Sequence, residues 1–416
     1  MRRLFHHDGF RAPQFIAAGL LLIYLLQCVW LQRVQTLRSS VADSDQALRI
    51  YQGLEQWKGG PIAGTPQSLR SETITGLASA GRAGQLRVRD GYDEDRSPLY
   101  YLVSAAPLLV SGGLRLPQSF QPYIAGTPYL FFGVMLGASL WYVARRLYGD
   151  AGGYIALVLY CFSPAMIVNV ADTQSRGEMG AVWGAFGCVF TAIAVAHTLY
   201  APREVVLWNW RRILLLGLSL GLAAGNQFSL GMLAVVILPL MLWVAPVRPG
   251  AVTAIWITAL GFAVVLLLGC YFFEPKLFLG GMLHARWIDF EPAAFGVAVS
   301  YRNALQAIFA GSPPMMIALP VTLIAYFGWK RARYFGNSAP LMIAALLLIS
   351  SLGAPSFPGQ GFRLTLLVFL FVFAGGVFAD LLETRGGPLV TAGLCGLLGA
   401  SALLNLLQLW RAALIR

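Results

Sequence analysis

The segment PLYYLVSAAPLLVSGGLRL, residues 98–116, decides how the rest of the chain is threaded through a membrane. It is apolar, but it contains Pro98, Pro107 and the Gly112-Gly113 pair, which suit a spanning helix poorly. We therefore predict that this segment lies in the outer interface or re-enters the bilayer from the same side. That choice fixes the side of the membrane on which every later loop falls.

The composition indicates that lipid is the main solvent of this protein. Of the 416 residues, 57% are hydrophobic and 12% are charged, whereas soluble domains carry about 25% charged residues. We predict an all-α polytopic membrane protein with about eleven transmembrane helices, forming a single membrane domain over residues 1–416. The predicted spans lie near residues 14–31, 122–144, 151–169, 178–199, 212–225, 228–246, 251–273, 313–329, 339–353, 362–382 and 387–409.

The positive charges set the orientation. Arg2, Arg3 and Arg11 precede the first span, so the N-terminus is predicted to be cytoplasmic. If 98–116 does not cross, the Arg145-Arg146 turn and the later basic turns also fall inside, as the positive-inside rule requires. Two long outer segments result: 32–121, with interfacial helices, and 274–312. The compact length and arginine-rich inner loops are typical of a bacterial inner membrane, with the working face in the periplasm.

Several functions are disfavoured by what the chain contains. The net charge of +12 is spread in short clusters between apolar runs, which favours anionic lipid and not nucleic acid as the neighbour. The five cysteines lie within apolar runs without metal-ligand spacing, and we predict no disulfide. There is no Walker, dinucleotide-binding, H-E-x-x-H or G-x-S-x-G motif. Mid-span positions are poor in ionisable residues, which argues against a proton-coupled transporter.

The first outer segment opens with two candidate catalytic carboxylates. Asp43 and Asp45 precede the stretch 46–54, whose pattern predicts a short amphipathic helix. One of them could simply cap that helix. Alternatively, one acts as a catalytic carboxylate, and the D-x-D spacing could also hold a divalent cation.

Further charged residues gather on the same predicted face. The stretch Asp93-Glu94-Asp95-Arg96 stands directly before the aromatic residue Tyr100 of the 98–116 segment. A solvated loop or snorkelling side chains would also explain such charges. Arginines, however, grip phosphate, and carboxylates can remove a proton from an acceptor. We interpret the set as a substrate-binding site for transfer from a lipid-linked phosphate; its other candidate members are Asp172, Arg176, Glu178, His284, Arg302 and Arg363.

Four motifs, taken in order, resemble the membrane glycosyltransferases of the GT-C superfold, in the protein O-mannosyltransferase and aminoarabinose-transferase branch. The stretch Arg96–Leu102 is similar to the family's H-P-P-L-Y-Y-L, with Arg and Ser in place of His and the first Pro. The resemblance runs from about residue 15 to about residue 382. The other three motifs are Asp43/Asp45 through Gly59, Arg145-Arg146-Leu147-Tyr148-Gly149 through Ser163-Pro164 to Asp172 and Glu178, and Gly361-Phe362-Arg363-Leu364.

The resemblance implies a donor that is a sugar on polyprenyl phosphate. Asp45 would be the general base, with Asp43 as the alternative, and the sugar would be transferred in one inverting displacement. Arg96, Arg302 and Arg363 would hold the departing phosphate. No metal is assigned, although a divalent cation is possible, and the acceptor could be protein, lipid or glycan. Two other hypotheses are a non-catalytic membrane scaffold or assembly partner, and a transporter of a lipid-linked saccharide.

Overall fold

The computed structural model describes ten stretches of the chain. They are residues 12–38, 44–67, 91–110, 121–171, 177–200, 210–288, 291–328, 334–353, 361–385 and 388–414. Their regular secondary structure is helical throughout. The predicted all-α class is therefore confirmed.

The described helices have the following order along the chain. The α-helices are α1 (Ala12–Arg38), α2 (Ser44–Trp57), α4 (Pro98–Val110), α5 (Gln121–Cys161), α6 (Pro164–Ala171), α7 (Gly177–Thr198), α9 (Trp210–Asn226), α10 (Leu233–Val244), α11 (Pro249–Cys270), α12 (Pro275–His284), α13 (Ala298–Gly311), α14 (Met315–Gly328), α15 (Tyr334–Gly353), α16 (Gly361–Arg385) and α17 (Pro388–Leu414). Two 3₁₀ turns join them, η3 (Phe228–Met232) and η4 (Pro292–Gly296).

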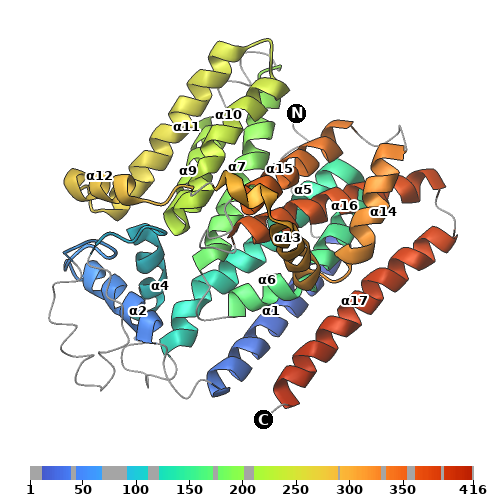
Figure 1. The fold of residues 1–416 in the computed structure, drawn as a ribbon, viewed down its shortest axis with the longest axis horizontal. Helices are drawn as coiled ribbons and strands as arrows, with labels where there is room; N and C mark the ends of the chain where they lie inside the picture. Colours follow the sequence, from blue (N-terminus) through green and yellow to red (C-terminus); the bar gives the residue numbers. More distant parts are fainter. Residues whose placement is uncertain are drawn as a thin grey trace.

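The centre of the bundle is α16. Every residue of α16 from 364 to 379 is buried, which is expected of a helix that is hydrophobic on all sides. It packs against α5, α7, α14 and α15, and Phe369 meets Phe186 and Phe190 of α7. α17, by contrast, lies along the margin of the bundle (Figure 1), and only a small part of its apolar stretch is buried.

Six helices in the described part of the chain are long and apolar enough to cross a membrane, or seven if the bent pair α13–α14 forms one span. They include α1, α7, α11, α16 and α17. The sixth is α5, whose 41 residues comprise two helices that meet at a kink at Gly149, a residue with non-helical backbone angles (φ 79°). The predicted count of about eleven spans is not confirmed.

The segment that decided the predicted topology forms the short helix α4. Its 13 residues give it a length of about 20 Å, less than the ~30 Å of a bilayer core. Residues 111–116 of the predicted segment lie outside the described residues. α4 instead buries Ala105 and Leu108 against Ile50 and Leu54 of α2.

The pairing of α2 with α4 is close because a glycine stands at the contact. The predicted amphipathic helix after Asp45 is confirmed as α2, and Gly53 faces the Tyr101 carbonyl of α4. The indole Nε1 of Trp57 donates to the Leu102 carbonyl at 2.9 Å. Gln56, which is fully buried, donates from Nε2 to the Cys270 carbonyl at the end of α11 (2.8 Å). These bonds join α2 to α4 and to the end of α11.

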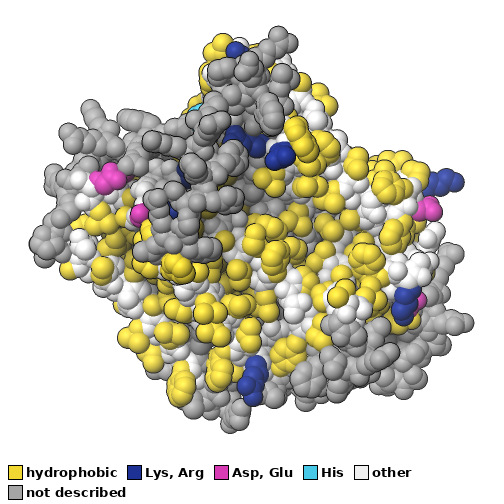
Figure 2. Space-filling view, turned by 180° about the vertical axis from the view of Figure 1, so that it is seen from behind, with side chains coloured by type: hydrophobic (Ala, Val, Ile, Leu, Met, Phe, Trp, Pro, Cys, Tyr) yellow, Lys and Arg dark blue, Asp and Glu magenta, His cyan; other side chains and the backbone are white. Residues whose placement is uncertain are grey.

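The outer surface agrees with a lipid environment. Figure 2 shows a face on which hydrophobic side chains predominate and coloured charged side chains are few. Large exposed apolar residues occur on several of the helices that could span, including Phe15 and Leu26 of α1, Ile257 of α11 and Leu403 of α17. Side chains of this kind would be unfavourable in water over so broad a surface.

We predict that Gly53→Ala destabilises the α2–α4 contact. A Cβ at this position would collide with the Tyr101 carbonyl oxygen and lie 2.8 Å from the Ala105 Cβ, and such overpacking typically costs about 1–3 kcal/mol. Thermal unfolding in detergent measures the effect. Gly19→Ala on α1, where a Cβ meets nothing within 4 Å, is the matched control and should leave the Tm unchanged or raise it slightly. Equal Tm values for the two variants would contradict the close packing.

Candidate functional site

The acidic segment 93–97 is fixed by main-chain hydrogen bonds to three distant parts of the chain. The Asp93 N–H donates to the Gly64 carbonyl at 2.8 Å, and the Ser97 N–H donates to Gly225 at 3.1 Å. The Asp95 and Glu94 carbonyls accept from the Phe228 N–H (2.9 Å) and the Arg286 N–H (2.6 Å). The stretch between α2 and α4, the turn after α9 and the segment after α12 therefore meet here.

The side chain of Asp93 organises this segment internally. Its Oδ1 accepts from the N–H groups of Asp95 (2.9 Å) and Arg96 (3.2 Å), and its Oδ2 accepts from the Tyr101 hydroxyl at 2.5 Å. Burial raises the pKa of Tyr101, and the adjacent Asp93 carboxylate raises it further, so the phenol stays protonated and donates. Gly64 (φ 68°) permits the close approach, since a Cβ there would lie 3.2 Å from the Asp93 Cβ. Asp93 is thus a positioning residue.

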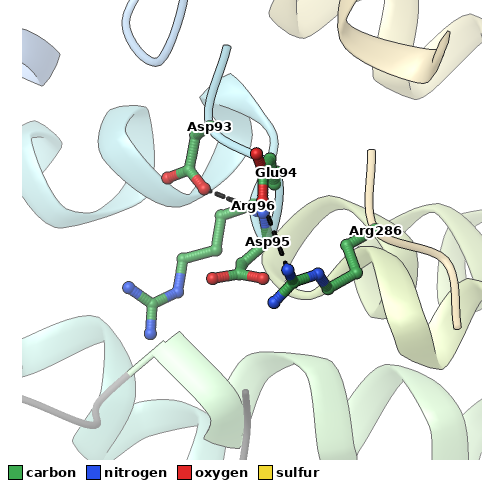
Figure 3. A network of polar contacts seen from close by, with 5 residues as sticks. All are labelled: Asp93, Glu94, Asp95, Arg96 and Arg286. Carbon is green, nitrogen blue, oxygen red and sulfur yellow. Dashed lines mark hydrogen bonds and ion pairs between the residues drawn. The ribbon is translucent and has the colours of Figure 1, made fainter. Parts of the chain in front are cut away.

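Arg96 is the central cation of the site. Its guanidinium carbon lies 4.5 Å from the centre of the Tyr100 ring, a cation–π distance. Burial acts to lower the pKa of Arg96, but Tyr100, Asp93 and Glu178 outweigh this effect, so the pKa is raised and the charge is secure. Figure 3 shows the side chain extending away from Glu94 and Arg286.

A second arginine reaches the same ring. Arg49 of α2 places its guanidinium carbon 6.0 Å from the centre of the Tyr100 ring. Sequence reasoning missed Arg49, because one basic residue in an amphipathic helix resembles any solvated position. The available signal was its spacing: Arg49 stands one turn after Asp45, so both Cα atoms lie on the same side of α2.

Glu178 approaches the cluster from α7. It is 6% exposed, stands in the first turn of α7 and accepts from Asn169 Nδ2 of α6 at 3.0 Å. A carboxylate there is favoured by the helix N-terminus, and Glu178 also stabilises the charge on Arg96. Two residues further along α7, a Cβ on Gly180 would stand 3.0 Å from the amide nitrogen of the buried Asn226. Glu178 therefore lies within electrostatic reach of Arg96, and its role in binding substrate stays a prediction.

Glu94 is paired with a residue outside the predicted set. Its Oε2 lies 3.7 Å from a terminal nitrogen of Arg286, and both side chains are partly exposed (Figure 3). A partly exposed ion pair of this kind contributes little to stability by itself. The main-chain hydrogen bond from the Arg286 N–H to the Glu94 carbonyl therefore holds the contact together. Arg286 ties the segment after α12 to the segment before α4.

The other predicted site residues have different outcomes. Asp45 is the second residue of α2, but its side chain, like Asp43, Asp172 and Arg176, lies outside the described residues. His284 stacks on Tyr92 at 4.9 Å, and its Nδ1 lies 2.8 Å from the Gly280 carbonyl. Arg302 and Arg363 are exposed on α13 and α16, and no described contact joins them to Arg96. Within the described stretches, no group of three or more His, Cys, Asp or Glu side chains could hold a metal ion.

The fold and this site define a polytopic helical membrane protein with a charged cluster at the end of its bundle. No family model matches the sequence, and no curated protein matches it. Solved structures do. The chain is similar to ArnT from Cupriavidus metallidurans bound to undecaprenyl phosphate, with a TM-score of 0.53, 14% identity, and coverage of 83% of this chain and 62% of ArnT.

The chain is also similar to the Archaeoglobus fulgidus oligosaccharyltransferase tethered with an acceptor peptide, with a TM-score of 0.61 and 10% identity over 96% of this chain and 55% of that one. The same archaeal enzyme, AglB, in complex with an inhibitory peptide and dolichol-phosphate, gives a TM-score of 0.59 and 11% identity, over 96% and 56% of the two chains. This chain spans less than two-thirds of each neighbour. The chain has the GT-C fold of these membrane glycosyltransferases, as its motifs predicted.

We predict that Tyr101→Phe loosens the acidic segment. The variant removes the donor to Asp93 Oδ2 and leaves a partly buried carboxylate oxygen without that partner, which costs about 1–3 kcal/mol. The Tm in detergent should fall accordingly. Tyr51→Phe, at an exposed position of α2, should leave the Tm as in the wild type. A Tyr101→Phe protein as stable as the wild type would show that Asp93 holds the segment without this bond.

Proposed function

We propose that this protein is a glycosyltransferase that moves a sugar from a polyprenyl-phosphate donor to an acceptor. The observation that carries the proposal is the convergence of Arg96 and Arg49 on the Tyr100 ring, beside the start of α2 where Asp45 stands. The fold neighbours add support, since one was solved with undecaprenyl phosphate and another with dolichol-phosphate. The reaction would take place at the periplasmic face of a bacterial inner membrane, with the N-terminus in the cytoplasm.

Arg96 and Arg49 suit the phosphate of the donor. Two guanidinium groups near one aromatic ring can bind phosphate oxygens with paired N–H donors. The carboxylates of Asp93 and Glu178 partly balance the positive charge of Arg96. The Asp93 carboxylate, however, already accepts hydrogen bonds from Tyr101 and two main-chain N–H groups. A bound phosphate would therefore meet cations whose position is fixed before the substrate arrives.

Asp45 is the proposed general base, and Asp43 is its alternative. The acceptor hydroxyl or amine would transfer its proton to the carboxylate while its heteroatom forms a bond to the anomeric carbon of the sugar. The bond from that carbon to the phosphate oxygen would break at the same time, and polyprenyl phosphate would leave with the electron pair. A single displacement of this kind inverts the anomeric configuration. No metal ion is assigned to this step, and among the described residues no cluster of three or more His, Cys, Asp or Glu side chains could hold one.

The first test measures release of the lipid carrier. Purified protein is incubated with a panel of undecaprenyl-phosphate sugars, and free undecaprenyl phosphate is quantified. We expect Asp45→Asn to lower release by about 10²–10⁴-fold, the usual effect of losing a general base. The control is Asp150→Asn, a carboxylate paired with Arg145 far from this site in the chain. If Asp43→Asn abolishes release and Asp45→Asn does not, the base is Asp43.

The second test measures binding of the carrier itself. Arg96→Ala and Arg49→Ala should each weaken binding of undecaprenyl phosphate by roughly 10- to 100-fold, because each removes a charged hydrogen-bond donor worth about 1.5–3 kcal/mol. Arg146→Ala, on α5 near Tyr142, should bind as the wild type does. Folding of each variant is checked by its Tm. Wild-type protein that neither binds the carrier nor turns over any donor would favour a membrane scaffold or assembly partner.

A further inference from the structure

We infer that the segment after α11 binds the outer surface of the lipid bilayer and holds the acidic segment at head-group depth. This interface element comprises the turn at Tyr271–Glu274 and helix α12. In Figure 1 it lies beside the end of α11, on the side of the molecule where α2 and α4 are found. Its proposed partner is the boundary between lipid head groups and acyl chains.

The interface element exposes large apolar side chains on one side. Leu279 is 58% exposed and Leu283 is 81% exposed, and the turn adds Phe272 and Phe273 at 45% and 66%. Leu279 and Leu283 are four residues apart and so share a face of α12. Lys276 is exposed three residues before Leu279, where its long stem can lie along lipid while its charge reaches the head groups. This combination is typical of a helix lying in a membrane interface.

The position of the element in the chain favours lipid as the occupant of this face. α11 is one of the helices long and apolar enough to cross the membrane, and it ends at Cys270. α12 begins at Pro275, so the short connection limits how far it can stand from the bilayer. A helix tethered at the end of a span, with leucines facing outward, meets lipid before it meets any other partner.

The backbone of the turn supports the same interpretation. Phe272 and Phe273 have φ values of 49° and 58°, a left-handed conformation that bulky residues rarely adopt and that usually takes glycine at a helix end. Their N–H groups still donate to the Gly269 and Leu268 carbonyls and close the end of α11. Two phenylalanines in this costly conformation are explained if their rings leave water for the interface, where aromatic side chains are favoured.

The other side of α12 packs on the acidic segment's neighbours. Gly280 faces the Tyr92 hydroxyl and Gly281 faces the Tyr271 hydroxyl, each so closely that a Cβ would collide with it. His284 stacks on Tyr92, the residue directly before Asp93. The depth at which α12 lies in the membrane therefore also fixes the depth of the segment that carries Arg96. His284, predicted as a substrate-binding residue, acts in this inference as a positioning residue.

The test uses spin labels and does not depend on activity. Cys395 is the one exposed cysteine among the five, and the other four are buried, so Cys395→Ser gives a background in which introduced cysteines are labelled. Nitroxides are placed at Leu279→Cys and Leu283→Cys in the full chain, reconstituted in phosphatidylcholine–phosphatidylglycerol vesicles. Accessibility to oxygen, which partitions into lipid, is compared with accessibility to a water-soluble nickel chelate. Val264→Cys on α11, which is 45% exposed, provides the lipid-facing reference.

We expect the ratio of oxygen to nickel accessibility at both positions to be severalfold above that of a free label in buffer, and at or below the Val264 value. High nickel accessibility at both positions would place α12 in water and overturn the inference. Low accessibility to both reagents would indicate protein contact, such as a second copy of this chain, and would overturn it as well. Because no donor or acceptor is involved, these outcomes are separate from the success or failure of the proposed transferase activity.

Discussion

The site depends on hydrogen-bond partners for the main-chain N–H and C=O groups of one irregular stretch in a largely apolar protein. Buried N–H and C=O groups that lack partners are costly, and residues 93–97 belong to neither α2 nor α4. Their main-chain groups are bonded to Gly64, Gly225, Phe228 and Arg286. Three segments far apart in the sequence are therefore held together by one short stretch, and the position of Arg96 follows from all three.

The charged residues of this cluster have two roles: the acidic ones fix the segment in place, and two arginines are available to bind an anion. The Asp93 carboxylate is saturated by two main-chain N–H groups and the Tyr101 hydroxyl, and Glu94 faces Arg286. Arg96 and Arg49, in contrast, both reach the face of an uncharged ring. Cations anchored by a neutral aromatic surface retain more of their attraction for an arriving anion than cations locked in ion pairs. This separation suits a ligand that is anionic at one end and apolar at the other.

The sequence was sufficient for the parts of the fold that depend on periodicity and on the order of motifs. The amphipathic pattern after Asp45 predicted α2, and the motif order predicted the GT-C fold. Glu178, proposed from its place in the chain, lies within electrostatic reach of Arg96. Arg49 and Arg286 could not be found in this way, because their importance comes from the Tyr100 ring and the Glu94 carbonyl, which only tertiary packing brings near. The kink at Gly149 divides α5 between two of the predicted spans, 122–144 and 151–169, although the total number of spans is not confirmed.

The burial of α16 bears on how the protein is assembled in the cell. Its stretch from 364 to 379 is surrounded by other helices, yet it is apolar enough for the insertion machinery to release it into lipid. Once in lipid it gains no hydrophobic free energy by moving among its neighbours, so its docking relies on van der Waals packing, on interhelical hydrogen bonds such as that from Asn337 of α15 to Asp380, and on lipid entropy. The contacts of Phe369 with the phenylalanines of α7 then stabilise the docking of α16, a late step in biogenesis. That step can be completed only after the helices that enclose α16 have been synthesised.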